Sequence, residues 1–122
     1  MPSQSLSGNV IALALIPLTV LVGCGNDTDY AVIGRQGALK AISIPAARAT
    51  DLDHYQRIVT KECQASGICI LSFFSDLPSA SYPLSDSALA MQTAQFNRNT
   101  TTGLDRLLLA CRLGDFRPED CF

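Results

Sequence analysis

The sequence predicts a small α/β or α+β domain, in which three or four strands pack with two helices and disulfides cross-link the chain. Two observations predict this fold class. Apolar runs typical of strands alternate along the chain with segments whose apolar side chains recur at helical spacing. In addition, residues 30–122 contain four cysteines, a number typical of a disulfide framework: Cys63, Cys69, Cys111 and Cys121.

The sequence pattern in the first half of the domain predicts a strand, a helix and a second strand. Residues 39–44 alternate enough for a strand and stop at Pro45. Thr50 or Asp51 can cap a helix that extends to about residue 65, because apolar side chains recur along it at helical spacing. Residues 68–74 are almost continuously apolar, which predicts a strand buried on both faces.

The second half predicts a loop over residues 75–83 and a second helix over residues 85–97, followed by a turn at 99–103. Residues 104–113 fit both a helix and a strand, because leucines occur at both spacings. We favour the strand, since strands separated by helices are typical of sheet crossovers and a third strand completes a β-α-β-α-β order.

The four cysteines allow three disulfide pairings. We favour the local pairs, Cys63 with Cys69 and Cys111 with Cys121, because each encloses an expected chain reversal; the crossed pairings remain open. A zinc site or a thioredoxin-like redox site is disfavoured, since the sequence has no C-x-x-C spacing. No metal ligand set is therefore assigned.

The N-terminal residues differ from the rest of the chain. The 122 residues are 48% hydrophobic and carry a net charge of −2, too weak a charge to bind the phosphates of nucleic acid. Every charged side chain lies at Asp27 or later, and residues 10–22 form an apolar run too short to span a bilayer. Such a run near the N-terminus is typical of a secretory signal peptide.

The end of this run, Leu21-Val22-Gly23-Cys24, resembles the lipobox of bacterial lipoproteins at every position. The resemblance implies cleavage after Gly23 and a covalent lipid on Cys24, although residues 1–9 lack the usual Lys or Arg. It divides the chain into a signal peptide (1–23), a lipidated cysteine with a polar tether (24–29) and one globular domain (30–122). Secretory cleavage without a lipid is the alternative.

The resemblance also implies a location. A lipid-anchored protein of this class faces the periplasm, and the uncharged Gly25 after the cysteine favours the outer membrane over the inner one. Two or three acyl chains exceed the marginal membrane affinity of a single chain, so the anchor would be stable. The covalent lipid on Cys24 is then the only attached group that we expect, with no other cofactor.

The mature region resembles small uncharacterised bacterial lipoproteins over about residues 50–122. The matching residues include Cys69, Phe73, Asp76, Pro83, the run 94–99, the run 102–108 without Leu104, and Cys111. The resemblance supports cysteines that pair around a loop. It implies no activity, because those proteins have none assigned.

One polar cluster is the candidate binding patch. Its amide and guanidinium groups could hold a carboxylate or sugar hydroxyls: Asn97, Arg98, Asn99, Asp105 and Arg106. The competing interpretation is a helix end and turn. His54, beside Asp51 and Asp53, is interpreted as part of an exposed first helical turn, so no catalytic residue is assigned.

These observations predict a membrane-anchored envelope lipoprotein that binds an envelope protein or a cell-wall ligand without catalysing a reaction. The loop at residues 75–83 and the segment 97–103 are the expected contact regions. One alternative is a structural or stress-related envelope lipoprotein. Another is a small periplasmic hydrolase, for which His54 is the single possible histidine base.

Overall fold

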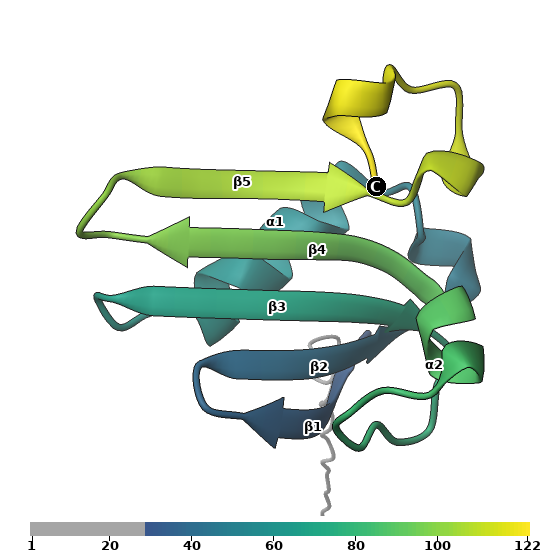
Figure 1. Cartoon of the computed structure of the whole chain (residues 1–122), viewed down its shortest axis with the longest axis horizontal. Helices are drawn as coiled ribbons and strands as arrows, with labels where there is room; N and C mark the ends of the chain where they lie inside the picture. The colour runs from purple at the N-terminus through teal and green to yellow at the C-terminus, as the bar shows by residue number, and fades with distance from the viewer. Residues whose placement is uncertain (1–28) are drawn as a thin grey trace, which may run out of the picture.

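The computed structural model describes residues 29–122, so the predicted signal peptide, Cys24 and most of the tether lie outside the described residues. The described chain forms one five-stranded sheet whose strands lie in sequence order (Figure 1). The strands are β1 (Ala31–Gln36), β2 (Leu39–Ile44), β3 (Ile68–Ser75), β4 (Gln92–Asn99) and β5 (Leu104–Leu109). The expectation of three or four strands was therefore too low.

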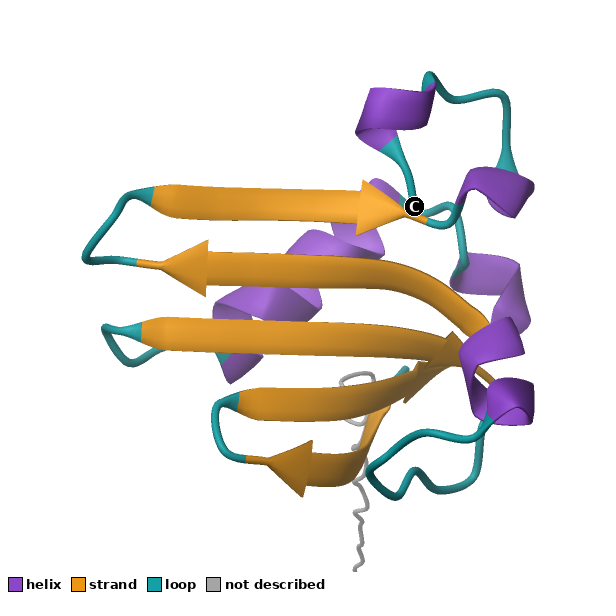
Figure 2. Ribbon diagram, viewed as in Figure 1, coloured by secondary structure: helices purple, strands orange, loops and turns teal. Residues whose placement is uncertain are grey.

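The sheet is mixed, which places the domain in the α+β class. Three neighbouring pairs are antiparallel, and β2 pairs with β3 in parallel. The parallel pair is joined by α1 (Leu52–Glu62), which lies across one face of the sheet (Figure 2). The second helix, α2 (Asp86–Ala90), is short and lies at one end of the sheet, in front of it in this view.

Several predicted elements are confirmed. β2 has the expected bounds, α1 begins after Asp51, and β3 extends the expected strand by one residue. The Asp51 carboxylate accepts a hydrogen bond from the backbone N–H of His54 at 3.1 Å, which is the predicted N-cap. The ambiguous leucine-rich segment is a strand up to Leu109, and a 3-10 helix (Cys111–Leu113) follows it.

Two parts of the secondary-structure prediction were wrong. The second helix ends at Ala90 rather than near residue 97, and the residues that follow form β4. Ala94 and Phe96 face the core while Gln95 and Asn97 alternate with them, and that period of two suits a strand paired on both sides. In addition, β1 was not predicted; it forms a hairpin with β2.

The core lies between α1 and the sheet. Its largest fully buried side chains include Tyr55 from α1, Phe73 from β3 and Phe96 from β4. The rings of Tyr55 and Phe73 meet edge to face with their centroids 4.8 Å apart. The Tyr55 hydroxyl donates a hydrogen bond to the carbonyl of Ala49 at 2.7 Å, so this buried polar group is satisfied.

The four cysteines of the domain form two disulfides, Cys63–Cys69 and Cys111–Cys121, which are the local pairs favoured by the sequence. The first ties the end of α1 to the start of β3. The second closes the C-terminal segment, where Cys121 lies beside Leu109 at the end of β5. Within residues 29–122, no helix is long and apolar enough to span a membrane.

Candidate binding site

The two ends of the sheet differ in the connections that they carry. At one end there are only short connections: the β1–β2 turn, the link from α1 to β3, and the β4–β5 turn (Figure 1). The other end carries residues 45–51, the long connection 76–91 that includes α2, and residues 110–122. Binding residues are found disproportionately on loops held by a rigid scaffold. The second end, which carries the longer connections, is therefore the better candidate for a binding site.

A hollow of about 450 Å³ lies at this second end, between the loop after β3 and α2. Four of its nine lining residues are serines, and none of the nine is ionisable. The others supply apolar surface. We call this hollow the serine pocket; its lining residues are Leu77, Ser79, Ala80, Ser81, Pro83, Ser85, Ser87, Ala88 and Met91.

The loop side of the serine pocket is held against β1 and β2 by backbone contacts. The N–H of Asp76 donates to the carbonyl of Ile44 at 2.9 Å, and Asp76 takes a positive φ of 53° as the chain leaves β3. Further along, the N–H of Ala80 donates to the carbonyl of Ile33 at 3.2 Å. Gly34 permits this approach, because a Cβ there would lie only 2.5 Å from the carbonyl oxygen of Ala80.

The helix side of the serine pocket is fixed by a serine cap. Ser85 precedes α2, and its hydroxyl accepts a hydrogen bond from the N–H of Ala88 at 3.2 Å. The Ser85 and Ser87 hydroxyl oxygens lie 3.1 Å apart. At the other end of α2, the carbonyl of Met91 accepts from the N–H of Ser75 at 3.0 Å, which returns the chain to the sheet.

Tyr82, in the same loop, has a hydroxyl group that is buried without a hydrogen-bond partner among the described residues. Burial raises the pKa of this phenol, so it remains a neutral donor and acceptor. Tyr82 is not among the lining residues of the serine pocket, where the hydroxyl groups come from the four serines and lie beside apolar surface. Such a lining suits an uncharged ligand that carries hydroxyl groups of its own.

The structure divides the polar patch that the sequence analysis selected. Arg98 and Asp105 are directly opposite across β4 and β5, as are Asn97 and Arg106 one position along. Because successive residues of a strand point to opposite faces, the two pairs lie on opposite sides of the sheet. Asn99 lies at the turn, where its side-chain oxygen accepts from the N–H of Thr101 at 3.0 Å.

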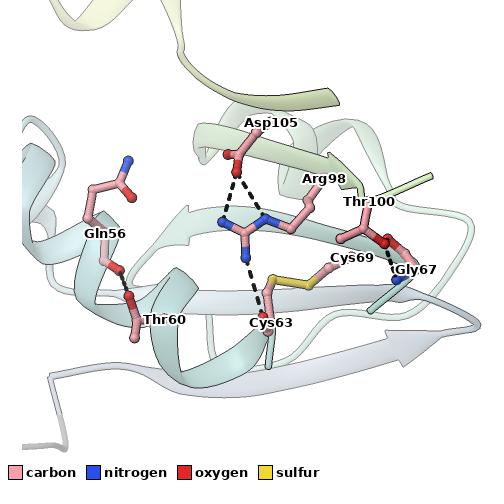
Figure 3. A network of polar contacts seen from close by, with 8 residues as sticks. All are labelled: Gln56, Thr60, Cys63, Gly67, Cys69, Arg98, Thr100 and Asp105. Carbon is pink, nitrogen blue, oxygen red and sulfur yellow. Dashed lines mark hydrogen bonds and ion pairs between the residues drawn. A yellow bond between two sulfur atoms is a disulfide. The ribbon is translucent and has the colours of Figure 1, made fainter. Parts of the chain in front are cut away.

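On the α1 side, Arg98 makes contacts within the domain (Figure 3). Its Nε and Nη2 donate to the Asp105 carboxylate at 3.1 and 2.9 Å, and its Nη1 donates to the carbonyl of Cys63 at 3.3 Å. Arg98 thus holds the end of α1 and the Cys63–Cys69 disulfide against β4. On the other side, Arg106 donates to the carbonyl of Glu119 at 2.6 Å.

His54 is buried, with 3% of its surface exposed, so interpreting it as part of an exposed helical turn was wrong. Neither ring nitrogen has a hydrogen-bond partner among the described residues. Burial lowers the pKa of His54, so the imidazole is neutral near pH 7. Its neighbour Asp51 has a lowered pKa because Arg48 donates to its carboxylate at 2.6 Å.

The loop of the serine pocket was among the contact regions expected from the sequence, but the pocket itself was not predicted. The sequence feature that could have indicated the pocket is the high frequency of serine in residues 79–87. Fold and pocket together define a small disulfide-bonded α+β domain with a hydroxyl-lined hollow at one end of its sheet. Comparison of the chain with protein-family models, with curated proteins and with solved structures found no match.

Proposed function

We propose that this protein is a bacterial envelope lipoprotein, anchored by lipid on Cys24, whose domain binds an uncharged, hydroxyl-bearing ligand in the serine pocket. The anchor is supported by the tetrapeptide that ends at Cys24. The binding role rests on one observation, the lining of four serines and apolar side chains without an ionisable group. A saccharide of the cell wall has the matching chemistry, because its hydroxyls both donate and accept hydrogen bonds.

The anchor is tested by Cys24→Ala. We expect the wild-type protein to take up a labelled fatty acid and to fractionate with membranes. The variant should lose the label and appear in the soluble periplasmic fraction, because the thioether-forming sulfur is absent. Membrane retention of a Cys24→Ala variant that carries no acyl label would contradict the lipid anchor.

The binding role is tested by filling the serine pocket. Ser81→Phe places an aromatic ring among the lining residues, and Ser66→Phe places the same ring on an exposed turn at the opposite end of the sheet. We expect soluble cell-wall glycan fragments to bind the wild-type chain and the Ser66→Phe control. Ser81→Phe should weaken binding by about ten-fold or more, equivalent to about 1.4 kcal/mol.

Calorimetry or chemical-shift titration measures these affinities. Equal binding by the two variants would move the ligand site away from the serine pocket. The absence of glycan binding by every form would overturn the saccharide assignment. Cross-linking in intact cells, followed by identification of the attached molecules, would then identify the partner directly.

A further inference from the structure

The chain leaves the described domain toward Cys24 at the end of the sheet that carries the serine pocket. We call residues 76–85, which include the loop side of the serine pocket, the pocket loop. Asp29 lies beside the start of this loop, since Asp29 and Asp76 line one small hollow of about 200 Å³. Five residue steps separate Asp29 from Cys24, and an extended chain covers at most about 3.6 Å per residue. A lipid on Cys24 would therefore hold this end within about 18 Å of the bilayer.

Most of the exposed large apolar side chains lie at the same end. We define the anchor end as Asp29 together with residues 44–53, 75–91 and 110–122. Of the seven large hydrophobic residues that are exposed in the described chain, five belong to it: Leu52, Leu89, Met91, Phe116 and Phe122. Ile68 and Leu104 are at the opposite end.

Hydrogen bonds connect the segments of the anchor end. The end of α2 is bonded to β3 through Met91 and Ser75. The next residue, Gln92, accepts a hydrogen bond from Arg112 at 2.7 Å, which joins the C-terminal segment to the start of β4. Leu89 and Met91 are thereby held in the same part of the fold as Phe116.

We propose that the anchor end rests on the bilayer surface, with the side chains of α2 and the C-terminal segment inserted among the lipid headgroups. This inference rests on the proposed lipidation of Cys24. The short tether raises the local concentration of lipid at this end, so weak apolar contacts suffice to orient the domain. A ligand in the serine pocket would then be held close to the membrane.

The charge of the anchor end selects the kind of lipid. Within the described residues, this end carries eight acidic side chains and three arginines. Anionic lipids would repel this excess of negative charge, whereas zwitterionic lipids would not. The proposed partner is therefore a zwitterionic lipid surface.

The experiment uses the full chain, which has no tryptophan, so that a single introduced tryptophan reports alone. Leu89→Trp and Phe116→Trp place the probe at the anchor end, and Leu104→Trp is the matched control at the opposite end. Each acylated protein is reconstituted into phosphatidylcholine vesicles that contain brominated acyl chains. We expect the tryptophan emission at residues 89 and 116 to shift to the blue and to lose about half or more of its intensity to bromine quenching. The reason is that interfacial side chains reach about 5–10 Å into the headgroup and acyl boundary.

The control at residue 104 should keep its emission, and anionic lipid at low salt should reduce the quenching at residues 89 and 116. An acylated, vesicle-bound protein with no quenching at either position would overturn the inference while leaving the anchor intact. Equal quenching at residue 104 would also overturn it. Stronger quenching with anionic lipid would overturn the stated lipid class. A chain without the acyl label and without vesicle binding would overturn the proposed anchor, and this inference with it.

Discussion

At the scale of single residues, Gly34 decides how closely the pocket loop can approach the sheet. A methyl group there would meet the carbonyl oxygen of Ala80 at 2.5 Å, so the loop backbone must move. We expect Gly34→Ala to lower the free energy of unfolding by about 1–3 kcal/mol, as overpacking does, and to weaken ligand binding in the serine pocket. Urea unfolding measures the first effect and titration with ligand the second.

Ala31→Ser, at an exposed position of the same strand, is the control for this prediction. We expect it to change the free energy of unfolding by less than about 0.5 kcal/mol, since Ala31 is exposed. An equally stable Gly34→Ala variant with unchanged ligand affinity would show that the approach of Ala80 to β1 is not a constraint.

His54 is expected to make the stability of the domain depend on pH. Burial lowers the pKa of its imidazole below the ordinary value of 6.5; Arg48 and Arg57 act in the same direction, and Asp29 and Asp51 oppose it. The unfolded chain therefore binds a proton more readily than the folded chain. We expect the free energy of unfolding to fall as the pH drops below 6.5, until the pH passes the lower pKa of the folded state.

Urea unfolding at a series of pH values checks this prediction, and His54→Leu should remove the dependence near neutral pH. Glu62 titrates in a separate range. Burial raises the pKa of its carboxyl, but hydrogen bonds from Tyr30 and Lys40 outweigh burial and hold the pKa below 4.5. A wild-type stability that is flat across pH 6.5 would contradict the burial of a neutral His54.

Arg98 is expected to act on stability rather than on ligand binding. Arg98→Ala removes its hydrogen bonds to Asp105 and to the carbonyl of Cys63, and should cost about 1–2 kcal/mol of the free energy of unfolding. Asp105→Asn should cost less than about 1 kcal/mol, because Asp105 is 55% exposed and Arg98 keeps its contact with Cys63. Unfolding curves and ligand titrations of both variants check this. Weaker ligand binding by folded Arg98→Ala would contradict it.

At the scale of elements, the Cys63–Cys69 disulfide holds the end of α1 to the start of β3. Replacing both cysteines by alanine should cost about 2.4 kcal/mol, the loop-closure entropy of so short a loop. Hydrogen exchange should rise first at the last turn of α1 and at the start of β3. A uniform rise over the whole sheet would show instead that the disulfide stabilises the domain globally.

The elements that could be predicted from the sequence are those whose signals are local. Residues 39–44 stop at a proline, α1 has an N-cap and one apolar face, and β3 is apolar except for Ser72 and Ser75. β4 could not be distinguished in this way, because Leu89, Thr93 and Phe96 also fit helical spacing. Its conformation is decided by pairing with β3 and β5, which are distant or ambiguous in the sequence.

The same division between local and long-range information applies to the candidate site. One binding patch was predicted from residues that are close along the chain: Asn97, Arg98, Asn99, Asp105 and Arg106. A hairpin placed Arg98 and Arg106 on opposite faces. The serine pocket depends on the approach of the 76–85 loop to β1, a strand that the sequence analysis missed, so the geometry of the pocket could not be foreseen.

At the scale of the whole molecule, the proposed lipid anchor makes the length of the tether a testable quantity, because the tether would set how strongly the anchor end is kept at the membrane. Inserting fifteen Gly/Ser residues after Asn26 lengthens the path from Cys24 to Asp29 from five steps to twenty. The effective concentration of the domain at the surface should fall by about eight-fold, since it varies roughly as the −3/2 power of tether length. Quenching at Leu89→Trp and Phe116→Trp should decrease accordingly, while acylation and vesicle binding stay unchanged. Quenching that does not depend on tether length would mean that the anchor end binds lipid without help from Cys24, and vesicle binding by the Cys24→Ala chain would then measure that intrinsic affinity.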